Sequence, residues 1–169
     1  IDATVPATGA VAWHRDGYPP HTVTGAGGEP HRAPTGAAGA LVVTRTDRRE
    51  ALLAGADGRE VWVAAPGESV RSIGERTAMV RSADAATIRA VDTASGKQRW
   101  SQPLPERAAV TVLRHAVLVL DEDTARLFAY DQDTGRRLLD ARILGEVIGS
   151  GPTGLILARG RTIGFVAWS

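Results

Sequence analysis

The sequence predicts an all-β fold of four-stranded antiparallel blades arranged around an axis, the architecture of a β-propeller. Three observations predict it. A glycine motif recurs four times, its later copies are spaced like propeller blades, and short alternating strands precede the glycines. About four blades' worth of strands fit within the 169 residues. That number corresponds to a small closed ring or to half of an eight-bladed ring.

In each copy of the motif, a glycine is followed four positions later by a large apolar residue. Successive glycines are 49, 38 and 39 residues apart, and the last two spacings match the roughly 40-residue period of four-stranded blades. Glycine permits the positive φ of a hairpin turn, and the bulky residue on the next strand can fill the gap between neighbouring blades. We therefore interpret the motif residues as structural blade-docking residues. They are Gly9 and Trp13, Gly58 and Trp62, Gly96 and Trp100, and Gly135 and Leu139.

The stretches before the motif have strand character. Residues 87–92 and 126–131 alternate apolar with polar or small side chains, which is typical of a half-buried strand. Further upstream lie the short apolar runs 41–43, 78–80 and 117–120. The predicted unit is therefore strand, turn, strand, glycine turn, strand.

Residues 91–100, Val-Asp-Thr-Ala-Ser-Gly-Lys-Gln-Arg-Trp, resemble the pyrroloquinoline-quinone (PQQ) repeat of quinoprotein propellers. Residues 130–135 resemble it equally well, with Leu139 replacing the tryptophan, and the resemblance covers nearly the whole chain outside 17–39. It implies that the Gly-to-Trp element is the tryptophan docking motif that joins adjacent blades. Enzymes of that family hold PQQ with a tryptophan floor, a carboxylate-bound Ca²⁺ and, in many members, a vicinal disulfide. None of those ligands can be matched here, so we expect no cofactor, no bound metal and no catalytic residue.

The two ends of the sequence suggest how a ring could close. Residues 17–39, rich in glycine and proline, are predicted to be an inserted loop. Residues 154–158 and 162–168 supply strands without a following Gly–Trp strand, and we expect residues 1–16 to provide that outer strand. Three arrangements stay open: a closed four-bladed ring, one piece of a larger ring, or two copies forming an eight-bladed ring. We favour completion by a second copy or by a companion segment, because an open arc would expose sheet faces and edges.

Composition narrows the function classes. Twenty basic and 19 acidic residues give a net charge of +1, which carries no nucleic-acid signal. The chain has no cysteine, which excludes disulfides and thiolate chemistry, and its most apolar stretch, 110–120, is interrupted by Arg114 and His115. We therefore expect no membrane span within this segment, because a spanning helix needs roughly 20 apolar residues. One lysine and no asparagine indicate GC-rich codons, as in an actinobacterium. Because the sequence starts at Ile1, inside a repeat, we expect a signal or an anchor upstream.

Several residues could carry chemistry, but each has a simpler structural interpretation. Asp131 and Asp133 have a spacing faintly like a calcium loop, yet they coincide with the blade turn, and residues 121–123 form an acidic turn. The glycines at 25–28 lack the helix or the lysine of a phosphate site, so we interpret them as loop. The tryptophans could form a ligand-stacking surface, but their fixed register favours packing between blades. The histidines show no short metal-ligand spacing; they are His14, His21, His31 and His115.

These observations predict a non-catalytic propeller that acts as a protein-interaction or scaffolding module, extracytoplasmic and either secreted or anchored as an ectodomain. Its protein partner would bind the ring face or the 17–39 loop, because loops on a rigid scaffold carry recognition. The alternative is a small-molecule-sensing or enzymatic propeller with a ligand site in the central channel.

Overall fold

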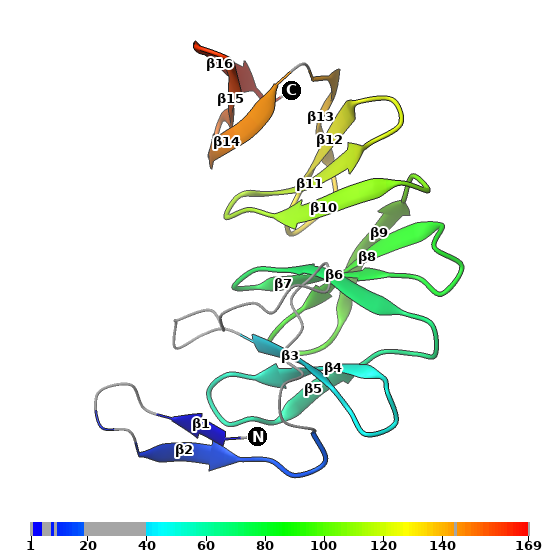
Figure 1. Ribbon diagram of the computed structural model, residues 1–169, viewed down its shortest axis with the longest axis vertical. Helices are drawn as coiled ribbons and strands as arrows, with labels where there is room; N and C mark the ends of the chain where they lie inside the picture. The colour runs from blue at the N-terminus through cyan, green and yellow to red at the C-terminus, as the bar shows by residue number, and fades with distance from the viewer. Residues whose placement is uncertain (1, 5–7, 9, 19–39, 144, 169) are drawn as a thin grey trace.

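A computed structural model describes residues 2–4, 8, 10–18, 40–143 and 145–168 of the chain. All regular structure in these residues is β, in sixteen strands that form five antiparallel sheets (Figure 1). The prediction of an all-β fold with four-stranded antiparallel blades is therefore confirmed. The described residues contain no helix that could cross a bilayer.

The two central sheets are complete four-stranded blades whose strands pair in chain order. The first comprises β6 (Ser69–Ile73), β7 (Thr77–Arg81), β8 (Thr87–Asp92) and β9 (Gln98–Pro103). The second comprises β10 (Ala108–Val112), β11 (Ala116–Asp121), β12 (Arg126–Asp131) and β13 (Arg137–Arg142).

The outer sheets have fewer strands among the described residues. One sheet comprises β3 (Ala40–Thr44), β4 (Glu50–Ala54) and β5 (Glu60–Val63). Another comprises β14 (Glu146–Gly151), β15 (Gly154–Arg159) and β16 (Thr162–Ala167). The fifth sheet is the pair β1 (Asp2–Thr4) and β2 (Val11–His14).

The sheets follow one another along the long axis of the molecule, with β1–β2 at one end and β14–β16 at the opposite end (Figure 1). In the described residues β2 pairs with β1, and the expectation that residues 1–16 supply the outer strand of the C-terminal sheet stays a prediction. Three sheets lie between the β1–β2 pair and the C-terminal sheet (Figure 1).

Each gap between neighbouring sheets is filled by its own apolar cluster. Trp13 and Tyr18 pack on buried residues of β3 and β4. The other three clusters are Val42, Leu52, Val70, Ala78, Val80 and Val91; Met79, Ile88, Ala90, Trp100, Val117, Val119 and Tyr130; and Ala116, Leu118, Leu127, Ala129, Leu138, Leu139 and Leu155. The chain therefore has a series of small cores between sheets, as expected for stacked repeats.

Side-chain oxygens also accept hydrogen bonds from backbone N–H groups on the first strand of the following sheet. The Glu50 carboxylate on β4 accepts a hydrogen bond from the Val70 backbone N–H on β6, at 2.5 Å. The Ser72 hydroxyl on β6 accepts one from the Val112 N–H on β10, at 3.0 Å. Because buried backbone N–H groups are costly when unpaired, these contacts link one sheet to the next.

Candidate functional site

The glycine of each described motif closes the turn before an outer strand. Gly58 N–H donates to Ala54 O at 2.8 Å, and Gly135 N–H donates to Asp131 O at 2.9 Å. Gly96 forms the same bond, and φ is +66° at Gly58 and +70° at both Gly96 and Gly135. Glycine adopts this left-handed conformation without the strain that a side chain brings, which accounts for its recurrence.

Two of the motif tryptophans lie against the glycine of the next sheet. A Cβ atom on Gly58 would lie 2.4 Å from Trp13 Cε3, and one on Gly135 would lie 2.6 Å from Trp100 Cγ. Trp13 Nε1 donates to Gly55 O at 2.9 Å, and Trp100 Nε1 donates to Gln132 O at 3.0 Å. The accepting carbonyl is three residues before the glycine in both cases, so the two contacts are equivalent.

The remaining motif residues are placed differently. Trp62 is half-buried, and the space beside Gly96 is filled mainly by the Val61 carbonyl oxygen, which a Cβ atom would approach to 1.8 Å. Leu139 is 7% exposed and packs in the cluster that contains Leu155. Gly9 lies outside the described residues. The docking role of the motif residues stays a prediction.

The acidic turn residues are occupied by contacts within the fold. Asp131 Oδ1 accepts hydrogen bonds from the Thr134 N–H and hydroxyl, both at 2.8 Å, and from the Asp133 N–H at 3.1 Å. Burial raises the pKa of Asp131, but these hydrogen bonds outweigh it, so the net pKa is lowered. Asp121 likewise accepts a 2.6 Å hydrogen bond from the Thr124 hydroxyl. Their geometry is that of a self-capped turn.

An ion-pair network joins the two central sheets. Arg99 contacts the Asp92 carboxylate of its own sheet and the Asp133 carboxylate of the next, the latter at 2.8 Å. Arg76 also pairs with Asp133, at 2.9 Å. Burial raises the pKa of Asp92, but hydrogen bonds from Ser95 and the Arg99 guanidinium lower it to a net value of about 2.

No group of three or more His, Asp or Glu side chains that could hold a metal ion occurs within the described ranges. His14 pairs with Asp16 at 2.8 Å, and His115 lies exposed in the β10–β11 turn. His21, His31 and the glycines at 25–28 lie outside the described residues, as does the predicted loop except Gly17 and Tyr18. The Tyr18 hydroxyl donates to Glu60 at 2.9 Å, which anchors the start of that segment on β5.

Two neighbouring hollows that share His115 lie along the hairpin turns of successive sheets, and we call them together the turn groove. The first has a volume of about 660 Å³ and is lined by Gly74, Glu75, Arg76, Val112, Leu113, Arg114, His115 and Gln132. The second has a volume of about 570 Å³ and is lined by His115, Asp131, Arg136, Leu138, Pro152, Thr153 and Trp168. The lining mixes apolar side chains, backbone groups and both signs of charge, with more arginines than carboxylates.

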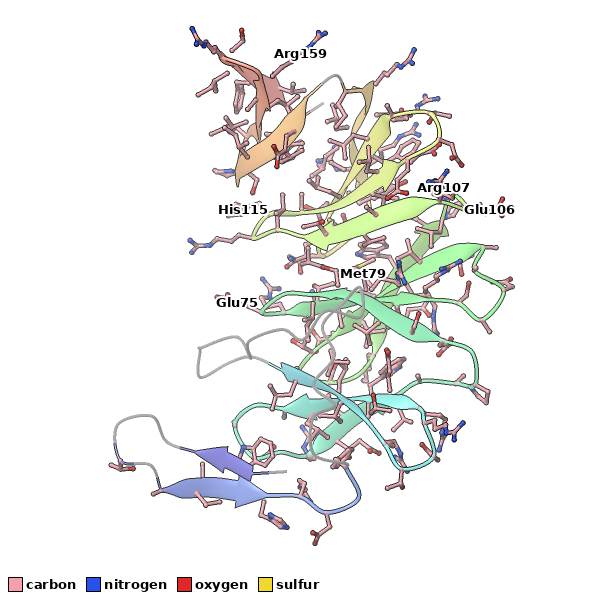
Figure 2. The ribbon with its side chains drawn as sticks, in the orientation of Figure 1. Glu75, Met79, Glu106, Arg107, His115 and Arg159 are labelled. Carbon is pink, nitrogen blue, oxygen red and sulfur yellow. The ribbon has the colours of Figure 1, made fainter. Side chains whose placement is uncertain are left out.

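The turns that build the groove are short and fixed. Gly74 N–H donates to Thr77 O, and Leu113 N–H donates to Ala116 O, both at 2.8 Å. The Gln132 amide donates to Leu113 O at 2.9 Å and ties the β12–β13 turn to the β10–β11 turn. Glu75 and His115 project from the same edge of the stack, whereas Arg107 lies at the opposite edge (Figure 2). The groove is therefore built on hydrogen-bonded turns and carries exposed charged side chains.

Sequence analysis did not identify this groove, because its lining residues come from hairpin turns far apart in the sequence. The sequence signal for the groove is that its lining residues occupy equivalent positions in successive repeats. The loop of the first hairpin in each of three successive sheets contributes two residues: Glu75 and Arg76, Arg114 and His115, and Pro152 and Thr153. Reading these loops as one surface requires the stacking of the sheets, which only the structure supplies.

Comparison with known proteins gives one family and several partial structural matches. A family model described as outer membrane protein assembly factor BamB matches residues 1–143 and 84–166. BamB from Moraxella catarrhalis is 21% identical over 78% of this chain and 44% of that chain, with a TM-score of 0.47. Apo AztD from Citrobacter koseri is 13% identical over 63% of this chain and 33% of that chain, with a TM-score of 0.47.

A quinohemoprotein alcohol dehydrogenase from Comamonas testosteroni is 17% identical over 72% of this chain and 21% of that chain, with a TM-score of 0.42. The chain thus spans less than half the length of each of these solved proteins. No curated protein matches the sequence.

Proposed function

Since this chain belongs to the family of the outer membrane protein assembly factor BamB, we propose that it is a non-catalytic β-propeller that binds a protein partner and acts as a scaffold. The family assignment agrees with the resemblance of residues 91–100 to the PQQ-like repeat. The observation that supports partner binding is the turn groove, whose lining residues come from three successive sheets.

The groove suits an extended peptide segment better than a compact small molecule. Its lining residues lie along a row of hairpin turns and come from three successive sheets. Arg114 and His115 are exposed at its centre, so a segment carrying carboxylates next to apolar residues would complement it. Hairpins held by a rigid scaffold are a common place for such recognition.

We place the protein outside the cytoplasm, as a secreted protein or an anchored ectodomain. The support is the family itself, that of the outer membrane protein assembly factor BamB. A periplasmic or surface fraction containing the full-length protein, and a cytoplasmic fraction without it, is the expected result of cell fractionation. Recovery in the cytoplasm alone would contradict this location.

Partner binding can be tested with a peptide library displayed on phage and selected on the immobilised full chain. We expect enriched peptides to bind the wild type and to lose at least tenfold in affinity on Arg114→Ala and His115→Ala, because about 1.4 kcal/mol corresponds to that factor. Arg107→Ala is the matched control, since it removes an exposed arginine from the opposite edge. Equal binding by Arg114→Ala and wild type would show that the groove is not the binding surface.

The non-catalytic part has a separate test. Thermal unfolding of the full chain is measured alone and with PQQ, with Ca²⁺ and with a panel of sugars. We expect the melting temperature to stay unchanged with each, because a ligand that binds only the folded state raises it. A rise of several degrees with any of them would favour a small-molecule site in the propeller channel.

A further inference from the structure

The guanidinium group of Arg76 lines the first hollow of the turn groove, where a single carboxylate holds it. Its Nη2 donates to Asp133 Oδ1 at 2.9 Å, from the β6–β7 turn of one central sheet to the β12–β13 turn of the next. The Arg76 side chain is 64% exposed, and Asp133 is its only ion-pair partner among the described residues. Because exposed ion pairs are weak, the guanidinium can exchange this carboxylate for another one at little cost.

Asp133 has a second partner that is held more firmly. Arg99 Nη1 donates to the same Asp133 oxygen at 2.8 Å, and the Arg99 side chain is only 18% exposed. Arg99 also contacts the Asp92 carboxylate of its own sheet and donates to the Thr77 hydroxyl at 3.3 Å. Asp133 therefore stays paired through Arg99 when Arg76 turns away.

The backbone beneath the Arg76 side chain is fixed. The Glu75 carbonyl oxygen accepts a hydrogen bond from the Thr93 hydroxyl at 2.8 Å, and the Arg76 carbonyl oxygen accepts one from the Thr93 N–H at 3.2 Å. Thr93 itself is only 4% exposed. A change of partner at Arg76 thus involves the side chain alone, so little conformational entropy is lost when a ligand binds there.

The charges around the first hollow match those of a single carboxylate. Arg76 and Arg114 supply two guanidinium groups, and Glu75 supplies the only carboxylate in the lining. Arg114 is exposed, and no carboxylate of the described residues pairs with it. Because Asp133 is retained by Arg99, one positive charge is left over in the hollow. One carboxylate neutralises that charge, whereas a phosphate dianion exceeds it.

We propose that Asp133 is an internal competitor at Arg76, and that an aspartate or glutamate side chain of the bound segment replaces it there. This inference rests on the proposed binding of a peptide segment in the turn groove and specifies the contact that holds it. Because the first hollow meets the second at His115, an extended segment continues past Arg76, so the carboxylate is that of an internal side chain. Its apolar neighbours contact Val112 and Leu113, which line the same hollow.

Competition predicts that removal of a carboxylate from the protein increases its affinity for an acidic ligand. Asp133→Asn frees Arg76 and should raise this affinity about two- to fivefold, the range for one exposed ion pair. In an Arg76→Ala background, Asp133→Asn should leave the affinity unchanged, because the contested group is absent. A general electrostatic effect of one lost negative charge would persist without Arg76, so the double variant separates the two explanations.

Nuclear magnetic resonance titration of the full chain measures these affinities. The probe is acetyl-Ala-Leu-Glu-Leu-Ala-amide, whose glutamate is its only charged group, and the control peptide has glutamine in that place. We expect the glutamate peptide to shift the backbone amide signals of Arg76 and Arg114 and to bind at least about fivefold more tightly than the control. Asp57→Asn, an exposed aspartate in the glycine turn of β4–β5, is the control for charge loss and should leave the affinity unchanged.

An Asp133→Asn variant with unchanged or lower affinity would overturn the proposal, and so would an equal gain in the absence of Arg76. Equal binding of the glutamate and glutamine peptides would overturn it as well. The proposed function fails separately: a chain that binds the glutamate peptide through Arg76 but selects no peptide from the phage library keeps this inference alone. Selected peptides that bind Arg76→Ala as tightly as wild type would keep the proposed function and contradict this inference.

Discussion

The indole ring of Trp100 lies on Gly135 of the next sheet and fills the space that a side chain would occupy there, since a Cβ atom would lie 2.6 Å from Trp100 Cγ. Gly135 also has φ of +70°, so glycine is required at this position for two independent reasons. Trp13 lies on Gly58 in the same way. The contact of a tryptophan ring with the glycine of the next sheet therefore occurs twice in the described residues.

Gly135→Ala is expected to destabilise the chain by about 2–4 kcal/mol, from a left-handed non-glycine residue and a clash with the buried Trp100 ring. Urea unfolding monitored by tryptophan fluorescence measures the loss. Gly160→Ala is the control, because φ is +58° there but no atom lies within 4 Å of the added Cβ. The control should lose only about 1–2 kcal/mol from backbone strain. Equal losses in the two variants would mean that the Trp100 contact contributes nothing.

Trp13→Ala should loosen one end of the stack and leave the rest unchanged. The ring covers buried residues of β3 and β4, and its Nε1 donates to Gly55 O at 2.9 Å. We expect faster amide hydrogen exchange in β3–β5, with unchanged protection in β10–β13, because stacked repeats lose stability locally. Trp13→Phe keeps the ring but loses the hydrogen bond and should show a smaller effect. Uniform acceleration through all sheets would contradict this stack of separate cores.

The repeated units could be predicted from the sequence because each carries its signal locally. The alternation in 87–92 and 126–131 coincides with β8 and β12, and the apolar runs at 41–43, 78–80 and 117–120 lie inside β3, β7 and β11. The innermost strands β6, β10 and β14 were not identified individually. They follow the preceding strand after a short connection, and Ser69–Ile73 has mixed polarity even though Val70 is only 4% exposed.

Contacts between sheets could not be predicted, because they depend on how repeats are rotated against one another. Nothing near Glu50 in the sequence indicates that its carboxylate reaches the Val70 N–H, twenty residues away. Arg99 is the only arginine at the third position after a motif glycine. Comparison of the motif copies therefore does not indicate its pairing with Asp133. Closure of the ring likewise depends on how the sheets are arranged in space, and the strand expected from residues 1–16 stays a prediction.

Glu50 is expected to tolerate substitution by glutamine but not by alanine. Burial raises the pKa of its carboxyl, although the hydrogen bond from Val70 partly offsets this, so ionisation costs stability in the folded state. Glu50→Gln keeps an acceptor without the charge and should change the free energy of unfolding at pH 7 by less than about 0.5 kcal/mol. Glu50→Ala leaves the Val70 N–H unpaired and should cost about 1–3 kcal/mol. Chemical denaturation of both variants measures the difference, and a Gln variant as unstable as the Ala variant would contradict the hydrogen-bond role.

Asp92 should make the stability of the chain depend on pH in the acid range. Its pKa is about 2 in the folded chain against 3.8 for the free side chain, so folding favours the ionised form. The stabilisation is complete above pH 3.8 and is lost as the pH falls through the folded value. Asp92→Asn should therefore lose about 1 kcal/mol at pH 7, after allowance for solvent screening, and nothing near pH 2. Urea unfolding at a series of pH values measures this difference, with the exposed Glu106→Gln as the control for loss of one negative charge. A difference between wild type and Asp92→Asn that stays constant down to pH 2 would show that the ionised carboxylate, with its Ser95 and Arg99 contacts, is not the source of the stabilisation.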